Sequence, residues 1–461
     1  MFGKRTQKLK QTVILSTLDK ALKSGAVKEE QVAEFFVKML ERDPSAPLGA
    51  KDGTVRTNNG ATAPSMKGVL AEVIRAHEHY GAYAGRHDGE KDVASRAAKD
   101  QATVEYTKRV NHYRAVIERF VGIDPKEDTL IYTLNTSDAI GKLALTCGYT
   151  SEDIVLVPRM EHTSNFLPWL LRSGASLVKI EQTREGDIDI NDLEGKLEKY
   201  KGKVKLVAFT AASNITGIRP PIKKLADRIH RYGALAAVDC AQYAPHFPMD
   251  KKGWGADFVY FSAHKLGAPI GPGVLAAPIA WLEARIPAIP GGGTIEDLAA
   301  DGTGDVPIWA PREAKHQPGT WPTIGIRALG RAAEIIMDEI GWSSLMQREQ
   351  ELLRYAYKKL SGIPGFEPLP IAPSRYENES LTPVISFNLA GYSPDELLEA
   401  LAAARIQVRG GSKDPICNHD YVRNVLGLKG MVRLSFTHHN TTDDVDRVIE
   451  VLQTMRAAKP M

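Results

Sequence analysis

The strongest constraint on this chain is an alternation of short apolar runs with helical patterns between residues 128 and 280. The runs are TLIYT at 129, DIVLVP at 153, SLVKIE at 176, VKLVAFT at 204, ALAAVD at 234 and DFVYFS at 257. One intervening stretch, from Pro221 to Gly233, places Ile222, Leu225 and Ile229 on a single helical face. This alternation predicts an α/β fold with a mostly parallel sheet that is buried on both faces.

Regions of different character flank this core. Residues 7 to 42 carry apolar stripes at helical spacing, and after about residue 335 helices alternate with the strands PVISFNLA and MVRLSF. Ser393, Pro394 and Glu396 form the pattern of a capping box at one of these helices. We therefore expect an N-terminal helical extension over 1–55, a large domain over 56–335 and a smaller α+β domain over 336–461.

Composition excludes several classes of protein. The formal charge is +3, from 59 basic and 56 acidic residues, which is too even to indicate a nucleic-acid or membrane surface as partner. The three cysteines lie far apart without metal-ligand spacing, so we expect no disulfide framework, no metal site and a reducing, cytoplasmic location. A transit peptide is the alternative for the first eighteen residues, which contain no acid but little arginine or serine. The sequence contains no uninterrupted apolar run of membrane-spanning length.

An acid ends one predicted strand, and a lysine closely follows another. Asp239 ends ALAAVD, at the edge where open α/β sheets bind ligands, and Lys265 follows FVYFS ahead of a glycine-rich stretch. A lysine amine whose pKa is lowered by its surroundings can form a Schiff base and move a substrate proton. Taken singly, Asp239 is explained as a helix cap and Lys265 as a surface residue. Their combination favours a covalent amine site.

The segments VDCAQ at 238 and FSAHKLGAPIGPG at 261 resemble the cofactor core of class V aminotransferases, especially cysteine desulfurases. Further matches follow in order after residue 55, beginning with RTNNGATAP, where Asn58 replaces the acid of the family's DNAATTP. The resemblance implies a fold type I architecture, with a mostly parallel seven-stranded sheet in the large domain and a smaller α+β domain. It implies pyridoxal 5'-phosphate as cofactor, bound by Lys265, with Asp239 paired to its ring nitrogen.

The same resemblance assigns the residues around the cofactor phosphate. TLNTSDAI at 133 is similar to the family segment that opens a helix under the phosphate, which makes Thr136 and Ser137 donors. Free amides and hydroxyls at a helix start do bind anions, although a plain helix cap is the alternative. Ser262 and His264 match positions that help to hold the same group.

Three further positions are implied to contact the cofactor ring. EHTSNFLPW at 161 resembles the family's EHHSNxLPW, whose first histidine, here His162, stacks on the pyridine; Thr163 replaces the second. Asn214 and Gln242 resemble residues beside the phenolic oxygen. Without the resemblance, these side chains would be ordinary structural or turn residues.

Substrate recognition is implied for two arginines and one cysteine. Arg433, in MVRLSF, resembles the arginine that receives the substrate α-carboxylate, and Arg409 matches a second substrate-facing arginine. Cys417 is comparable to the desulfurase cysteine that attacks substrate sulfur. About three extra residues separate it from Arg409, and CNHDYV replaces the family's CxxPL. A buried spectator thiol is the alternative.

These matches predict an enzyme that converts L-cysteine to L-alanine with a persulfide on the enzyme, using His162 as acid/base helper and Lys265 as proton shuttle. Carbon-sulfur lyases, aminotransferases and epimerases of the same family are alternatives, as is a noncatalytic protein that keeps the fold. Gly319 and Thr320 match residues that reach the phosphate of a neighbouring subunit, which implies a homodimer. A sulfur-acceptor protein is a further implied partner.

Overall fold

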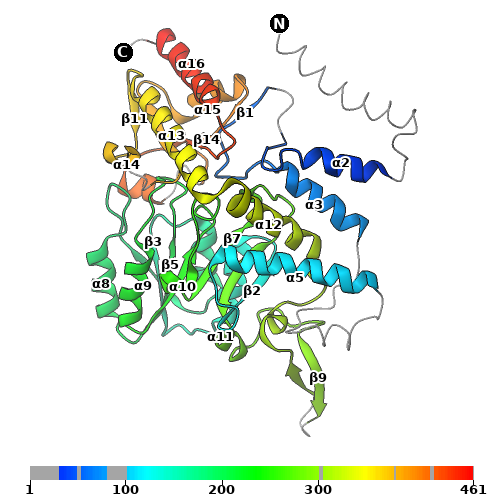
Figure 1. The fold of residues 1–461 in the computed structure, drawn as a ribbon. Coiled ribbons are helices and arrows are strands. Elements are labelled where there is room, and N and C mark those ends of the chain that lie inside the picture. Colours follow the sequence, from blue (N-terminus) through cyan, green and yellow to red (C-terminus); the bar gives the residue numbers. More distant parts are fainter. Residues whose placement is uncertain are drawn as a thin grey trace.

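The computed structural model describes residues 31–48, 53–79, 101–300, 305–377, 381–415 and 420–459. Over these residues a large α/β domain carries a smaller domain at one end (Figure 1). Of the helical stretch predicted over residues 7 to 42, only the part from residue 31 is described. There α2 (Val32–Leu40) forms a helix as expected and packs on α3 (Lys67–Glu78).

Seven strands form the central sheet of the large domain. In spatial order they are β2 (Asp128–Thr133), β8 (Gly273–Pro278), β7 (Phe258–Ser262), β6 (Leu235–Asp239), β5 (Val204–Thr210), β3 (Ile154–Pro158) and β4 (Ser176–Ile180). Strand β8 runs antiparallel to both of its neighbours, and the other pairs within the sheet are parallel. The six apolar runs are six of these strands, which confirms the predicted mostly parallel sheet.

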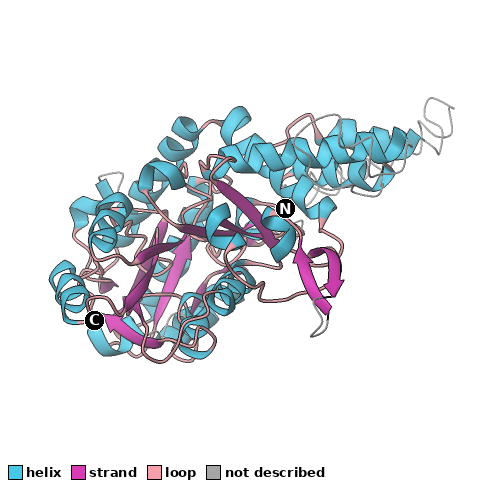
Figure 2. Cartoon of the chain, turned by 90° about the horizontal axis from the view of Figure 1, so that it is seen from below, coloured by secondary structure: helices cyan, strands magenta, loops and turns pink. Residues whose placement is uncertain are grey.

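Helices cover both faces of this sheet (Figure 2). Along β3, Ile154 and Leu156 pack into one core while Val155 and Val157 pack into the other, because successive side chains of a strand point in opposite directions. Helices α5 (Gln101–Val121), α8 (Ile190–Lys199), α9 (Ile222–Arg231) and α12 (Thr323–Glu334) cover the first core. The second is covered by α6 (Thr136–Thr146), α7 (Leu167–Leu171) and α11 (Ile279–Glu283). A short helix, α10 (Lys251–Trp254), precedes β7.

The smaller domain is built on a four-stranded antiparallel sheet with a core of its own. Its strands, in spatial order, are β11 (Phe366–Pro368), β12 (Val384–Leu389), β15 (Met431–Ser435) and β14 (Arg409–Gly411). Its helices are α13 (Trp342–Ser361), α14 (Pro373–Glu377), α15 (Pro394–Ala403) and α16 (Thr442–Ala458). Helix α15 begins with the predicted capping box, in which Ser393 accepts from the Glu396 amide and Glu396 accepts from the Ser393 amide.

A strand from the start of the chain joins this C-terminal domain. β1 (Val55–Arg56) pairs in parallel with β13 (Ile406–Gln407), and the hydroxyl of Thr57 donates to the carbonyl of Gln407 at 2.9 Å. Segment 55–57 is therefore tied to residues that come about 350 positions later. This tie also brings residues 58 to 61 to the junction between the two domains.

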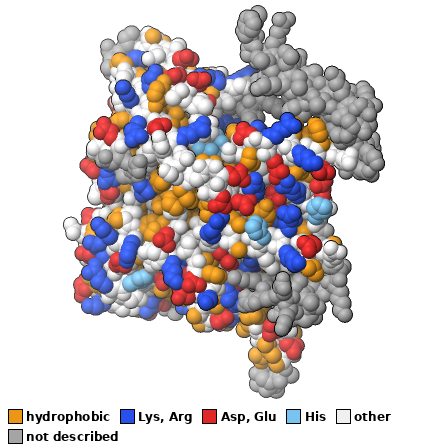
Figure 3. All heavy atoms as spheres, in the orientation of Figure 1, with side chains coloured by type: hydrophobic (Ala, Val, Ile, Leu, Met, Phe, Trp, Pro, Cys, Tyr) orange, Lys and Arg blue, Asp and Glu red, His pale blue; other side chains and the backbone are white. Residues whose placement is uncertain are grey.

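A β-hairpin projects from the surface of the large domain (Figure 1). β9 (Ile295–Ala300) and β10 (Asp305–Trp309) form an antiparallel hairpin that stands away from the large domain (Figures 1 and 2). Elsewhere on the face drawn in Figure 3, acidic and basic side chains are interspersed, in keeping with the balanced charge. Among the described residues, no helix is both long and apolar enough to span a membrane.

Candidate active site

A cavity of about 450 Å³ opens where the two domains meet, at the carboxyl ends of β5, β6 and β7. The sequence-predicted residues that line it are Thr136, Ser137, His162, Asn214, Asp239, Gln242, Ser262, His264, Lys265, Arg409 and Arg433. Two predicted residues lie elsewhere in the structure, and a third is not among the described residues. Gly319 and Thr320 are exposed and do not line this cavity, and Cys417 lies outside the described residues.

Asp239 and Lys265 lie on the large-domain wall of this cavity. Asp239 is the last residue of β6 and is buried, and Lys265 lies in the short helix η3 (Ala263–Leu266) directly after β7. Burial raises the pKa of Asp239 to about 6, although the Ala241 amide at 2.9 Å and the positive charge of Lys265 oppose the rise. Burial disfavours the charged form of Lys265 as well, and it lowers the pKa of this amine to about 8. About a tenth of Lys265 is therefore the neutral, nucleophilic amine at pH 7, far more than for a lysine of ordinary pKa.

A second group of side chains gathers at the start of α6. Asn135 caps this helix by accepting from the Asp138 amide at 3.0 Å, and the Thr136 amide donates to the Ser262 hydroxyl at 2.7 Å. The hydroxyls of Ser137 and Ser164 lie 2.6 Å apart. An α-helix that begins at a cavity directs its N-terminal amides toward it, and such a site binds anions.

The approach of β8 to this helix start requires a glycine. A Cβ on Gly273 would lie 2.3 Å from the carbonyl carbon of Asn135, so no larger residue fits there without moving the backbone. His264 also lines the cavity, and burial, with a smaller contribution from Lys265, lowers its pKa to about 4. His264 is therefore neutral at physiological pH, and its one ring N–H can donate to an anion.

His162 stands at the edge of a buried polar network that the sequence analysis missed. The neighbouring Glu161 accepts from Asn165 Nδ2 and from the Thr210 amide, each at 2.7 Å, and Tyr260 donates its hydroxyl to Asn165 Oδ1 at 2.7 Å. Burial raises the pKa of Glu161 to about 8, and the charge of Asp239 adds to the rise. One feature of the sequence could have revealed this network. Glu161 directly precedes His162 and opens the segment EHTSNFLPW, which ends in apolar residues.

The small domain supplies the opposite wall through two arginines on adjacent strands. Arg409 in β14 stands directly across from Arg433 in β15. Arg433 is buried, and its two terminal nitrogens donate to the Asn214 carbonyl at 2.8 Å and to Asn58 Oδ1 at 3.2 Å. Arg409 donates through Nε to Asp414 at 2.7 Å. The structure thus brings together both arginines that the sequence predicted to face a substrate.

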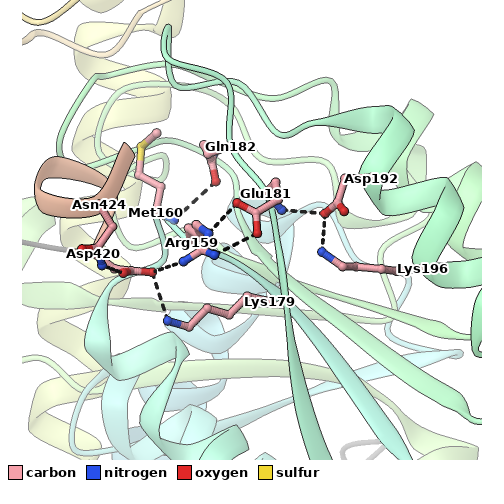
Figure 4. A network of polar contacts seen from close by, with 9 residues as sticks. All are labelled: Arg159, Met160, Lys179, Glu181, Gln182, Asp192, Lys196, Asp420 and Asn424. Atoms are coloured by element: carbon pink, nitrogen blue, oxygen red, sulfur yellow. Dashed lines mark hydrogen bonds and ion pairs between the residues drawn. The ribbon is translucent and has the colours of Figure 1, made fainter. Parts of the chain in front are cut away.

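A network of ion pairs joins the small domain to the large one beside this wall (Figure 4). Asp420 accepts from Arg159 at 3.1 Å and from Lys179 at 3.0 Å, and Arg159 makes a second, two-pronged pair with Glu181. Asp420 directly precedes the short helix η6 (Tyr421–Val425). These contacts therefore fix the start of η6 on the ends of β3 and β4.

The model of the family described as aminotransferase class-V matches residues 57–448. The chain belongs to this family. Among class-V relatives, a probable cysteine desulfurase of Streptomyces coelicolor is 30% identical over 414 residues, which cover 87% of this chain and 92% of the relative. A probable cysteine desulfurase of Halalkalibacterium halodurans is 32% identical over 348 residues, covering 74% and 80%.

The apo structure of a cysteine desulfurase from Thermococcus onnurineus NA1 superposes on this class-V chain with a TM-score of 0.77. Sequence identity is 26%, and the match covers 91% of this chain and 98% of the other. The family and the fold type I architecture expected from the sequence are thereby confirmed.

Proposed function

We propose that this class-V chain is a pyridoxal-phosphate enzyme that converts L-cysteine to L-alanine and transfers the sulfur to Cys417. The observation that carries the proposal is that one cavity joins a lysine of lowered pKa, a buried carboxylate and a helix start. The similarity to relatives named as cysteine desulfurases supports the choice of substrate.

The residues of the cavity fit this cofactor. Its volume of about 450 Å³ lies in the range of small-molecule sites, and it presents an amine, an acid and an anion site on different elements. Lys265 would hold the cofactor covalently and Asp239 would pair with its ring nitrogen. The residues that would hold the phosphate are Thr136, Ser137, Ser262 and His264, and those that would contact the ring are His162, Asn214 and Gln242. When bound, the cofactor withdraws electrons from the substrate α-carbon.

The side chains of this chain would then bind the substrate and move its protons. Arg433 receives the α-carboxylate, Lys265 takes the α-proton and returns one, and His162 assists as acid or base. The thiolate of Cys417 forms a sulfur–sulfur bond with the substrate thiol as the carbon–sulfur bond breaks. The β-carbon takes up a proton, which completes L-alanine. A thiol reductant or a sulfur-acceptor protein then removes the sulfur from Cys417.

Two of the three cysteines are poor candidates for that thiolate. Cys147 and Cys240 are both buried, and burial raises the pKa of Cys147 to about 12 and that of Cys240 well above its usual range. A cysteine with so high a pKa stays protonated at neutral pH and is a weak nucleophile. By elimination among the cysteines of this sequence, Cys417 takes the role.

The decisive experiment compares Cys417→Ala with Cys147→Ala in an assay for alanine and sulfide from L-cysteine and a reductant. The proposal expects Cys417→Ala to lose both products while it retains cofactor absorbance, and Cys147→Ala to resemble the wild type. Formation of pyruvate and ammonia by the wild type would instead identify a lyase. Purified protein that takes up no cofactor would identify a noncatalytic member of the family.

The proposal includes a homodimer with the cavity at its interface. Leu134 lines the cavity and is 82% exposed. Ile270 directly precedes Gly271, which also lines the cavity, and Ile270 is 57% exposed. Large apolar side chains at such exposure favour a protein partner. Gly319 and Thr320 do not line the cavity of their own chain, which is expected of residues that contact the cofactor of a neighbouring subunit. Sedimentation of the holoenzyme should give twice the chain mass; a monomer at micromolar concentration would contradict this part.

A further inference from the structure

Glu161 ties the chain directly before His162 to the end of a central strand. One oxygen of its carboxylate accepts from the main-chain amide of Thr210, the last residue of β5, at 2.7 Å. Thr210 lines the cavity, whereas Glu161 is buried and does not line it. The sheet edge at which the cavity opens therefore fixes the position of the residue that precedes His162.

Asn165 ties the chain on the other side of His162. Its main-chain amide donates to the His162 carbonyl at 2.7 Å, and its side-chain nitrogen donates to the second oxygen of Glu161 at 2.7 Å. Its side-chain oxygen accepts from the hydroxyl of Tyr260 at 2.7 Å and from the indole nitrogen of Trp169 at 3.2 Å. The side chains of this network are buried. Glu161 and Asn165 thus bracket His162 and are bonded to each other.

The ring of His162 is oriented from the same segment. Its Nδ1 accepts from the main-chain amide of Ser164 at 3.1 Å, within the short helix η2 (Thr163–Asn165). A main-chain N–H can only donate, so this Nδ1 carries no proton, and in the neutral ring the proton is on Nε2. The placement of η2 therefore decides both where the ring lies and which ring nitrogen carries the proton.

We propose that Glu161 is a positioning residue that holds η2, and with it the ring of His162, against the bound cofactor. It acts through its hydrogen bonds to the last residue of β5 and the last residue of η2. The inference rests on the proposed function, in which His162 contacts the ring of pyridoxal phosphate. A contact between two aromatic rings depends on their separation and tilt, so a displaced η2 should weaken it.

The donors and acceptors of this network allow a swap test. Glu161→Gln leaves one acceptor oxygen for two donors, the Thr210 amide and the side-chain nitrogen of Asn165. Asn165 cannot turn its own oxygen toward the new amide without losing its bonds to Tyr260 and Trp169. Adding Asn165→Asp supplies the missing acceptor, and the second aspartate oxygen still accepts from both aromatic residues. The double variant therefore keeps every bond, with the acid and the amide exchanged.

The experiment measures the affinity of each apo chain for pyridoxal phosphate by fluorescence titration. Glu161→Gln should bind the cofactor about threefold to tenfold more weakly than the wild type, and the double variant should regain most of that affinity. Tyr260→Phe removes one donor but keeps the aromatic ring, so it should lose affinity in the same direction and by less. The matched control is Glu198→Gln, the same change at an exposed position on α8, which should equal the wild type.

A double-mutant cycle separates an effect through His162 from general damage to the fold. His162→Ala should weaken cofactor binding by itself, and Glu161→Gln should add little in that background, because the ring that it positions is gone. Additive losses, unchanged affinity in Glu161→Gln, or a double variant Glu161→Gln/Asn165→Asp that binds as weakly as Glu161→Gln would each overturn the inference. If Glu161→Gln does not fold, Tyr260→Phe takes its place in the cycle.

The result is separable from the fate of the desulfurase proposal. Cofactor binding by the apo chain requires neither L-cysteine nor the thiol of Cys417. A wild type that binds pyridoxal phosphate but leaves L-cysteine intact contradicts the proposed reaction. The role of Glu161 is then still decided by the titrations and the cycle.

Discussion

The two walls of the cavity are built in different ways. On the large-domain wall, Asp239 and Ser262 end buried strands, so sheet register places them, and Lys265 lies in the short helix η3 that directly follows β7. On the small-domain wall, Arg409 and Arg433 stand on adjacent antiparallel strands. Arg409 is oriented by Asp414, five positions further along the chain, whereas Arg433 is oriented by Asn58 and by the Asn214 carbonyl, which come from distant segments. We propose that the first wall holds the cofactor and that the second sets the choice of substrate.

The largest effect should come from the large-domain wall. Lys265→Ala removes the amine that would hold the cofactor, so we expect activity to fall by about a thousandfold or more and the absorbance of covalently held cofactor to disappear. Lys224→Ala, at an exposed position on α9, is the control and should change neither. Retention of covalently held cofactor by Lys265→Ala would show that the wall has been assigned wrongly.

A smaller and different effect should come from the opposite wall. Arg433→Lys keeps the charge but loses the planar fork, so KM for L-cysteine should rise by about tenfold to a hundredfold. Cofactor content, measured by absorbance after alkaline release, should stay at the wild-type level. If this variant lost its cofactor, the proposal that the large-domain wall holds the cofactor and the small-domain wall binds the substrate would be refuted.

The pKa of Lys265, read from the pH dependence of cofactor capture, should shift in opposite directions when a charge is removed from one wall or from the other. The neutral amine of Lys265 is the reactive form, and its pKa is lowered to about 8, so capture by the apo chain should speed up as pH rises through about 8 and then level off. Asp239 raises this pKa and Arg433 lowers it. Stopped-flow absorbance should therefore show a lower midpoint for Asp239→Asn and a higher one for Arg433→Gln; shifts of the same sign would contradict the electrostatics.

The smallest effects should come from two helix caps, one at the cavity and one remote from it. Asn135→Ala and Ser393→Ala each remove a cap bond, and each should lower the free energy of unfolding by about 1 kcal/mol in urea titrations. Asn135→Ala alone should also weaken cofactor binding, because Asn135 lines the cavity. Equal cofactor affinity in both variants would show that the start of α6 does not bind the cofactor phosphate.

The sequence predicted the parts of this molecule that depend on local pattern. Strand alternation identified six of the seven central strands, and position after a strand marked Asp239 and Lys265. Strand β8 was not among the predicted runs, although GVLAAP at 273 is a short apolar run and the short connection from β7 leaves too little chain for a crossover helix, which indicates an antiparallel strand. Such a signal was available in the sequence.

Other features depend on contacts between distant positions and leave no local pattern. The bond from Tyr260 to Asn165 spans 95 positions, and the bond from Arg433 to Asn58 spans 375. Whether a glutamate such as Glu161 is buried beside Asp239 follows only from how strands and loops pack together. Cys417 was named from the resemblance alone, and its place in the fold lies outside the described residues.

The pairing of β1 with β13 has a consequence for synthesis on the ribosome. Thr57 and Gln407 are 350 positions apart, so at typical elongation rates the N-terminal strand waits roughly 20 to 70 seconds for its partner to be made. The central sheet can assemble during that interval, since its seven strands end at Pro278. The small-domain wall of the cavity is then completed last, when the nascent chain is nearly finished, so a truncated product would carry Lys265 without Arg409 and Arg433.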